Sequence, residues 1–314
     1  MTGGDTGEGP TRILVIRLGA LGDFVLSMGP FKAIRDHHPD AHITLLTTAP
    51  YGGLGEACGD FDQVWIDSRP SIRQPRAWFS LARRLRRGRF ERVYDLQTSD
   101  RSGLYFRLFG LRRPEWSGIA RGCSHPDVNP DRRRIHTVER QAAQLAAAGI
   151  PEVPATELSW IEADVGRFGL TGRFALLVPG GAAHRPEKRW PAARYAALAT
   201  RLADQGIRPA LIGSATERQT LVDIAGGSAH ALDLCGQTDL ADIVGLARGA
   251  AVAVGNDTGP MHLIAAAGCP CLTLFSAASD PVRSAPRGAS VEVLQCTSLA
   301  NLAVDDVIAA LRPR

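Results

Sequence analysis

Arg12-Ile-Leu-Val-Ile-Arg17 is a short apolar run with a charged residue at each end, and Gly19-Ala-Leu-Gly22-Asp23 follows just after it. A continuous apolar run of this length is typical of a strand buried on both faces of a parallel sheet. The two glycines predict a tight turn, and residues 24–37 then have helical periodicity. Strand, glycine turn and helix in this order indicate the start of a Rossmann-like domain.

The same alternation of strands and helices continues along the chain and predicts an α/β fold class. In the first half, strands are expected at 42–47, 63–66 and 92–96, and helices at 76–87, 101–109 and 137–148. In the second half, strands are expected at 174–178, 209–212, 230–234, 251–254 and 271–275, and helices at 191–205, 217–225, 240–248, 260–267 and 304–311.

The length of 314 residues and a stretch rich in Pro and Gly at 150–172 predict two domains. We expect a first Rossmann-like domain over 1–150 and a second over 151–314, facing each other across a central cleft. The last helix, 304–311, follows an apparently complete second sheet, so it can pack back on the first domain.

Several function classes are disfavoured by the composition. Hydrophobic residues make up 45% of the chain, yet no apolar run approaches the roughly 20 residues of a membrane span. The first ten residues lack the basic and apolar regions of a signal peptide. The six cysteines show no zinc-site spacing. We therefore expect a cytoplasmic globular protein without a structural metal site.

Charge is distributed unevenly. Residues 1–67 contain 4 Lys and Arg against 9 Asp and Glu, whereas residues 68–140 contain 18 against 7. A basic block of this kind indicates either an anionic partner or an arginine-rich solvated surface.

The turn after the first strand carries Asp23, which would lie near the start of a helix. A carboxylate there can act as a general base toward an incoming hydroxyl group, or it can simply cap the helix. Gly19 and Gly22 do not have the G-x-G-x-x-G spacing of a dinucleotide site.

Three turns of the second half also carry groups suited to a ligand. The turn with Gly180 and Lys188 suits a diphosphate, although a solvated basic loop is an equal alternative. Glu217, after the strand 209–212, can bind a ribose or base, or act as a helix-start acid. The turn from Asn256 to His262 brings a carboxylate, a hydroxyl and free backbone N–H groups to a helix N-terminus, which favours anion binding.

Asp60-Phe61-Asp62 resembles a DxD metal motif, but it precedes a strand and is better interpreted as a turn.

Taken together, these motifs resemble glycosyltransferase family 9, the ADP-heptose:lipopolysaccharide heptosyltransferases, from Arg12 to about Phe275. The resemblance rests on the order of Leu21-Gly22-Asp23, Asp95-Leu96-Gln97, Lys188-Arg189-Trp190-Pro191 and Asp257-Thr258-Gly259-Pro260-Met261-His262. It implies the two-domain GT-B fold, with the donor bound mainly by the C-terminal domain and the acceptor by the N-terminal domain.

The resemblance also implies roles for individual residues. Asp23 matches the proposed catalytic base, Lys188 the donor-phosphate lysine, and Glu217 the acid that binds the nucleoside. Asp257 matches the residue that contacts the sugar. Thr258, Gly259 and His262 match the phosphate-side turn, and Gly180 is expected beside the donor. On the acceptor side we expect Gly22, Gln97 and Arg101.

The function that follows is inverting transfer of a heptose or related sugar from an ADP-sugar to a hydroxyl group of a lipopolysaccharide core acceptor. No cofactor or metal is expected beyond the donor substrate. The expected partners are the nucleotide sugar, an anionic glycolipid acceptor and an anionic inner-membrane surface, but no nucleic acid. Three alternatives stay open: a protein O-heptosyltransferase, an epimerase or hydrolase of the same architecture, and a non-catalytic sugar-nucleotide-binding protein.

Overall fold

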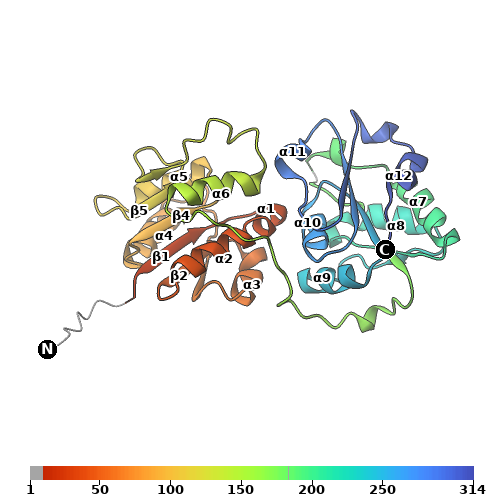
Figure 1. Cartoon of the computed structure of the whole chain (residues 1–314), viewed down its shortest axis with the longest axis horizontal. Helices are drawn as coiled ribbons and strands as arrows, with labels where there is room; N and C mark the ends of the chain where they lie inside the picture. The colour runs from red at the N-terminus through yellow and green to blue at the C-terminus, as the bar shows by residue number, and fades with distance from the viewer. Residues whose placement is uncertain (1–9, 183) are drawn as a thin grey trace. The chain divides into compact units, whose positions relative to one another are not determined.

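The computed structural model describes residues 10–182 and 184–314 as two compact units, each built on its own six-stranded parallel sheet (Figure 1). The first unit contains residues up to 19, 27–132 and 138–155, and the second contains 20–26, 133–137 and 156–314. The segment 1–9, on which the expected absence of a signal peptide depends, lies outside the described residues. Among the described residues, no helix is long and apolar enough to cross a membrane.

The first sheet has the strand order β3-β2-β1-β4-β5-β6, which is the order of a Rossmann fold. Its central strands are almost wholly buried because helices cover both faces of the sheet. The strands are β1 (Arg12–Ile16), β2 (His42–Thr47), β3 (Gln63–Ile66), β4 (Arg92–Asp95), β5 (Glu115–Gly118) and β6 (His125–Pro126).

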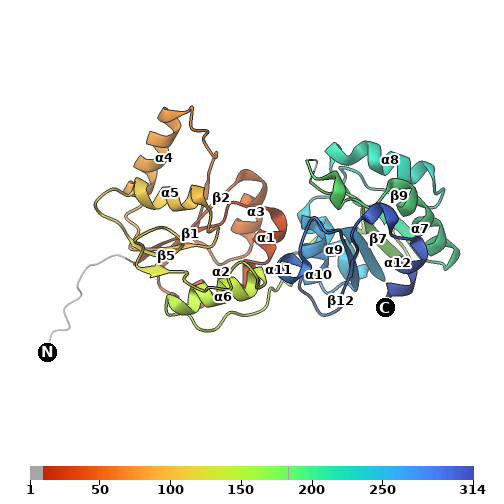
Figure 2. The ribbon, with the colours of Figure 1, turned by 90° about the horizontal axis from the view of Figure 1, so that it is seen from above.

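Helices cover the two faces of this sheet. Figure 2 shows α4 (Pro75–Arg87) and α5 (Asp100–Leu108) on one side, and α2 (Met28–His37) and α6 (Thr137–Ala147) on the other. The remaining helix, α3 (Ala49–Ala57), packs on β2 and β3. The aromatic side chains of α5 and β5 form the core beneath α4 and α5, where Phe106 lies 5.2 Å from Trp116 between ring centroids.

The helix expected over residues 24–37 is in fact two helices, α1 (Leu21–Val25) and α2. Pro30 lies in the first turn of α2, where its missing N–H is tolerated. In an unbroken helix its ring would clash with the carbonyl group of Leu26, so the helix must restart. As a result α1 is separated from α2 and belongs to the second unit.

The second sheet has the order β12-β11-β10-β7-β8-β9, which is again the Rossmann order with β7 and β10 at its centre. The strands are β7 (Phe174–Val178), β8 (Arg208–Leu211), β9 (Leu232–Asp233), β10 (Val252–Asn256), β11 (Cys271–Phe275) and β12 (Val291–Gln295). The edge strand β12 was not expected from the sequence, because a glutamate and a glutamine interrupt its apolar residues and no continuous apolar run is formed.

In the second unit, α7 (Ala192–Asp204), α8 (Arg218–Gly226) and α12 (Val304–Ala310) lie on one side of the sheet, and α9 (Leu240–Gly249) and α10 (Gly259–Ala266) on the other (Figure 1). A four-residue helix, α11 (Pro281–Ser284), lies between β11 and β12 in sequence. The last helix, α12, packs in the second unit. Val307 and Leu311 are buried in the core with Leu198 and Leu202 of α7.

Candidate active site

The point where the second sheet reverses its strand order lies between β7 and β10, and ligands of open α/β sheets bind at such a point. The side chain of Asn256, the last residue of β10, fixes the two turns there. Its Nδ2 donates to the carbonyl groups of Pro179 (2.8 Å) and Gly180 (3.1 Å). Its Oδ1 accepts from the Trp190 N–H (3.0 Å) and the Tyr195 hydroxyl (3.1 Å). This buried amide therefore holds the glycine turn in place.

Glu217 joins the turn after β8 to the same glycine turn. Its Oε1 accepts from the backbone N–H of Gly181 at 2.9 Å, and its Oε2 accepts from the N–H and hydroxyl of Ser214, both at 2.8 Å. Gly180 must lack a side chain here, because a Cβ would lie 1.9 Å from Glu217 Oε1. Glu217 thus serves as a helix-start acid and at the same time lies against the predicted donor turn.

The turn after β10 presents Asp257 and Thr258 at the start of α10. Thr258 is the N-cap residue with an extended backbone, and its side chain makes no capping hydrogen bond. Pro260 has no N–H and the Met261 N–H donates to the Thr258 carbonyl group at 3.1 Å, so the start of α10 offers an anion the Gly259 N–H and the helix dipole. Lys188 reaches this turn from the loop after β7, with 2.6 Å between its Nζ and Asp257 Oδ2. Both side chains are largely buried, at 14% and 10% exposure.

His262 lies in the first turn of α10 and is buried. Burial lowers its pKa to about 4, although Asp257 and Asp23 partly oppose the shift. The imidazole is therefore neutral at neutral pH. Among the residues that the structure describes, its Nδ1 atom has no hydrogen-bond partner.

Asp23 is half-buried in the first turn of α1, and the N-cap position of that helix is Ala20. Asp23 therefore does not occupy the N-cap position of α1, although an acid in the first turn still interacts favourably with the helix dipole. Helix α1 packs against α10, so Asp23 is part of the same compact unit as Lys188 and Asp257.

A cavity of about 440 Å³ is lined by seven of the residues singled out from the sequence. All of its lining residues belong to the second unit. The seven are Gly22, Asp23, Lys188, Asp257, Thr258, Gly259 and His262. Ala182 and Ser284 also line it and were not expected, since neither has a side chain that marks a ligand site in sequence.

Gln97 and Arg101 lie outside this cavity, in the first unit at the carboxyl end of β4. Gln97 Oε1 accepts from the Leu18 N–H at 2.8 Å. Arg101 donates to the Pro70 carbonyl group at 3.2 Å and stacks over Trp78. Gly22, which was expected on the acceptor side with them, lies beside His262 and lines the cavity.

The Asp60-Phe61-Asp62 segment precedes β3 as expected for a turn. Asp62 Oδ2 accepts from the Ile43 N–H (2.8 Å) and from Arg35 (2.5 Å), so this carboxylate is used in joining strand ends. Among the residues that the structure describes, no three His, Cys, Asp or Glu side chains gather as a metal site.

Comparison with known proteins identifies the family of this chain. The sequence model of the family described as "Glycosyltransferase family 9 (heptosyltransferase)" matches residues 78–303. Lipopolysaccharide heptosyltransferase 2 of Escherichia coli K12 is 27% identical over 85% of this chain and 83% of its own length.

Solved structures show the same fold. The family 9 glycosyltransferase of Veillonella parvula superposes with a TM-score of 0.83 at 20% identity, covering 96% of both chains. E. coli heptosyltransferase WaaC with ADP-2-deoxy-2-fluoro heptose gives a TM-score of 0.72 at 21% identity, covering 95% of this chain and 98% of that one. The fold is thus of the GT-B type, and the chain belongs to glycosyltransferase family 9, the heptosyltransferase family.

Proposed function

We propose that this glycosyltransferase transfers a heptose from ADP-heptose to a hydroxyl group of a lipopolysaccharide core acceptor, with inversion at the anomeric carbon. The observation that carries the proposal is the shared cavity, which places Asp23 beside Lys188 and the Asp257–Thr258 turn. Two relatives support it. One is a lipopolysaccharide heptosyltransferase, and the solved structure of the other contains an ADP-heptose analogue.

Asp23 acts as the general base in this proposal. Its carboxylate accepts the proton of the acceptor hydroxyl as that oxygen forms a bond to the anomeric carbon. The bond between the anomeric carbon and the phosphate oxygen breaks on the opposite face, and ADP leaves with the electron pair. His262, which is neutral because it is buried, adds no positive charge to this cavity.

The leaving diphosphate is stabilised by Lys188 and by the N-terminus of α10. Lys188 is held by Asp257, so the protein itself positions the ammonium group for the donor. The Gly259 N–H and the dipole of α10 supply a second source of positive potential. Asp257 then lies where it can contact the sugar.

The nucleoside is expected next to Glu217 and Gly180, at the end of the second sheet. Glu217 uses one carboxylate oxygen to hold Gly181 of the glycine turn and the other to hold Ser214. A ribose or adenine that binds there meets a rigid, hydrogen-bonded edge, which lowers the entropy cost of binding.

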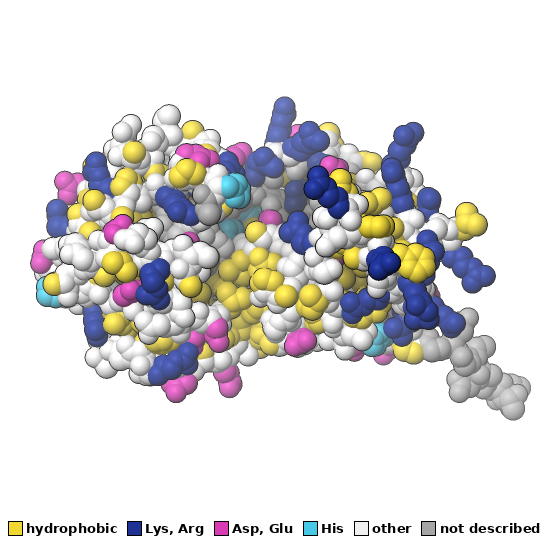
Figure 3. Space-filling model, turned by 180° about the vertical axis from the view of Figure 1, so that it is seen from behind, with side chains coloured by type: hydrophobic (Ala, Val, Ile, Leu, Met, Phe, Trp, Pro, Cys, Tyr) yellow, Lys and Arg dark blue, Asp and Glu magenta, His cyan; other side chains and the backbone are white. Residues whose placement is uncertain are grey.

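The first unit offers a surface suited to an anionic acceptor and to anionic lipid. The outer face of α4 carries Arg76, Phe79, Arg83 and Arg87 at helical spacing, and Phe79 is 71% exposed. Figure 3 shows Lys and Arg side chains gathered with exposed apolar side chains on the unit that carries the chain's N-terminus.

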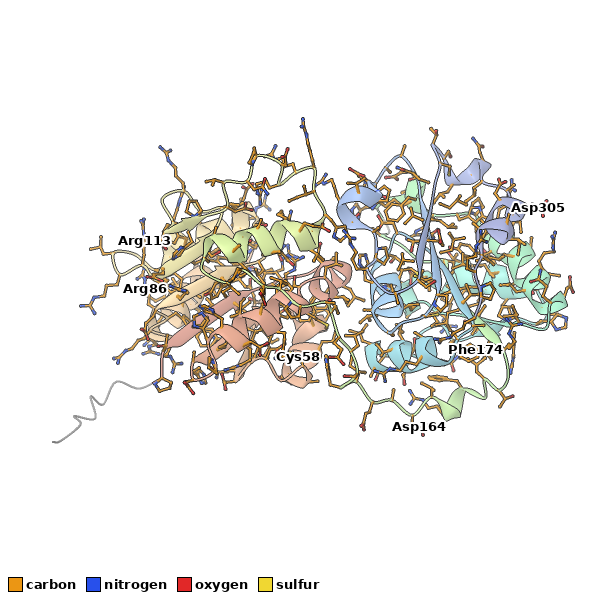
Figure 4. All side chains as sticks on the ribbon, in the orientation of Figure 1. Cys58, Arg86, Arg113, Asp164, Phe174 and Asp305 are labelled. Carbon is orange, nitrogen blue, oxygen red and sulfur yellow. The ribbon has the colours of Figure 1, made fainter. Side chains whose placement is uncertain are left out.

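A hollow of about 1050 Å³ lies at the end of this surface and is lined by Arg86, Arg89, Arg112 and Arg113, with Leu111 fully exposed at its rim. Figure 4 shows Arg86 and Arg113 near each other there. Each basic residue near anionic lipid contributes about 1 kcal/mol, so several suffice for reversible docking.

Vesicle co-sedimentation tests the docking. Arg84 stacks on Trp65, and Arg86 donates to the Leu108 carbonyl group, so the cleaner variant is Arg76/Arg83/Arg87→Gln. Binding should require anionic lipid, fall with added salt and fall in this variant. Equal binding to neutral vesicles, or no binding to anionic ones, would show that these arginines are only a solvated surface.

The donor proposal is tested by calorimetry with ADP, UDP, GDP and ADP-heptose, followed by transfer assays with the tightest donor. ADP and ADP-heptose should bind most tightly. Preference for another base, or donor hydrolysis that is unaffected by acceptor, would contradict the proposal and favour a different family 9 donor or a hydrolase.

A further inference from the structure

Two glycines lie where α1 packs on α10, and each one is opposite a side chain of the other helix. Gly22 is the second residue of α1. A Cβ at this position would lie 2.6 Å from Cδ2 and 2.7 Å from Nε2 of His262. Real Cβ atoms essentially never approach other heavy atoms to less than 3.0 Å, so any side chain at position 22 would force α1 and the His262 ring apart.

Gly259 makes the reciprocal contact. It is the first residue of α10, and a Cβ there would lie 2.6 Å from Cβ and 3.0 Å from Cγ of Leu21 on α1. Neither Gly22 nor Gly259 has a positive φ. The backbone conformation therefore does not require glycine at either position, and the requirement is for space between the helices.

Two other helical glycines have open space around them. A Cβ at Gly103 in α5 or at Gly226 in α8 would meet no atom within 4 Å. These two positions are therefore matched controls, because an alanine there changes helix propensity without any clash.

We infer that Gly22 and Gly259 are positioning residues that set the distance between the Asp23 carboxylate and the Asp257–Thr258 turn. The inference rests on the proposed roles of Asp23 and of that turn. Asp23 follows Gly22 directly, and Asp257 and Thr258 precede Gly259. The proposed base and the proposed donor turn are therefore each next in sequence to one of the two glycines. Misplacement of a reacting group by about 1 Å can lower a rate by about 100-fold.

Kinetics of alanine variants separate positioning from simple packing. Gly22→Ala should lower kcat by 10- to 100-fold and leave the Kd for ADP within threefold, because the substitution is on α1 and replaces neither Lys188 nor any residue of α10. Gly103→Ala and Gly226→Ala should retain the kcat of the wild type. Unchanged kcat in Gly22→Ala, or loss of ADP affinity without loss of kcat, would overturn the inference.

An exchange of side chains across the contact provides a rescue. Gly259→Ala should lower kcat. The double variant Gly259→Ala/Leu21→Gly should have a kcat at least tenfold higher than that of Gly259→Ala, because removing the Leu21 side chain clears the clashing atoms. Thermal unfolding of each variant shows whether it is folded. A folded double variant with no recovery would contradict the inference.

Crystal structures of Gly22→Ala and the wild type with ADP keep the inference separate from the proposed function. A larger distance between the carboxylates of Asp23 and Asp257 in the variant is expected. If the distance is unchanged, the positioning role is wrong even when the enzyme transfers heptose. If the wild type transfers no heptose, the proposed function is wrong, and the distance still decides the packing role.

Discussion

Lys188 and Asp257 form an ion pair with 2.6 Å between Nζ and Oδ2, just before the first turn of α10. Because both side chains are mostly buried, loss of one partner leaves a charge without compensation. Lys188→Ala should therefore lower both the thermal stability of the protein and its affinity for ADP, the latter by at least tenfold, measured by differential scanning fluorimetry and calorimetry.

The control for this prediction is Lys32→Ala. Lys32 pairs with Asp36 one turn further along α2, and both side chains are more than half exposed. An exposed pair of this kind contributes roughly 0.5 kcal/mol or less. If Lys188→Ala and Lys32→Ala behave alike, Lys188 has no special place in donor binding.

Gly180→Ala should weaken ADP binding by about tenfold, because its Cβ would displace the Glu217 carboxylate and open the glycine turn. Gly181→Ala is the matched control, since the nearest atoms to its Cβ would be 3.6 Å away on Arg189. Calorimetric titration of both variants with ADP makes the comparison. Equal affinities would place the nucleoside elsewhere.

His262 makes the stability depend on pH. Its pKa is about 4 in the folded protein and about 6.5 when unfolded, so between these values the unfolded chain binds more protons than the folded one. Stability therefore falls as pH falls through this window. From pH 7 to pH 5 the loss due to His262 is roughly 2 kcal/mol. Urea unfolding at the two pH values should show a smaller difference for His262→Gln than for the wild type, and an equal difference would place the pH dependence in other groups.

The architecture could be predicted largely from the sequence because the central strands are continuous apolar runs. Residues 42–47 and 271–275 form strands at the expected bounds. The edge strand β12 and the break between α1 and α2 could not be predicted from periodicity. The first has exposed positions, and the second depends on the ring of Pro30, whose effect is steric and not part of the apolar pattern.

The residue types of the candidate site could be predicted from the sequence, but which of these residues lie together could be predicted less well. Asp23, Lys188 and Asp257 each follow a strand of a Rossmann-like sheet, which singled them out. The assignment of Asp23 to the same compact unit as Lys188 depends on the packing of α1 against α10, which no local pattern encodes. For the same reason, Gly22 could be placed beside His262 only from the structure.

The most direct test of the account is the Asp23→Asn variant in a transfer assay with ADP-heptose and a heptose-deficient lipopolysaccharide core acceptor. Asp100→Asn is its control, since Asp100 is also an acid in a first helical turn but lies in α5. We predict that Asp23→Asn binds ADP within a few-fold of the wild type and transfers heptose about 100-fold more slowly, while Asp100→Asn is unchanged. Transfer at the wild-type rate by Asp23→Asn would contradict the assignment of Asp23 as the base.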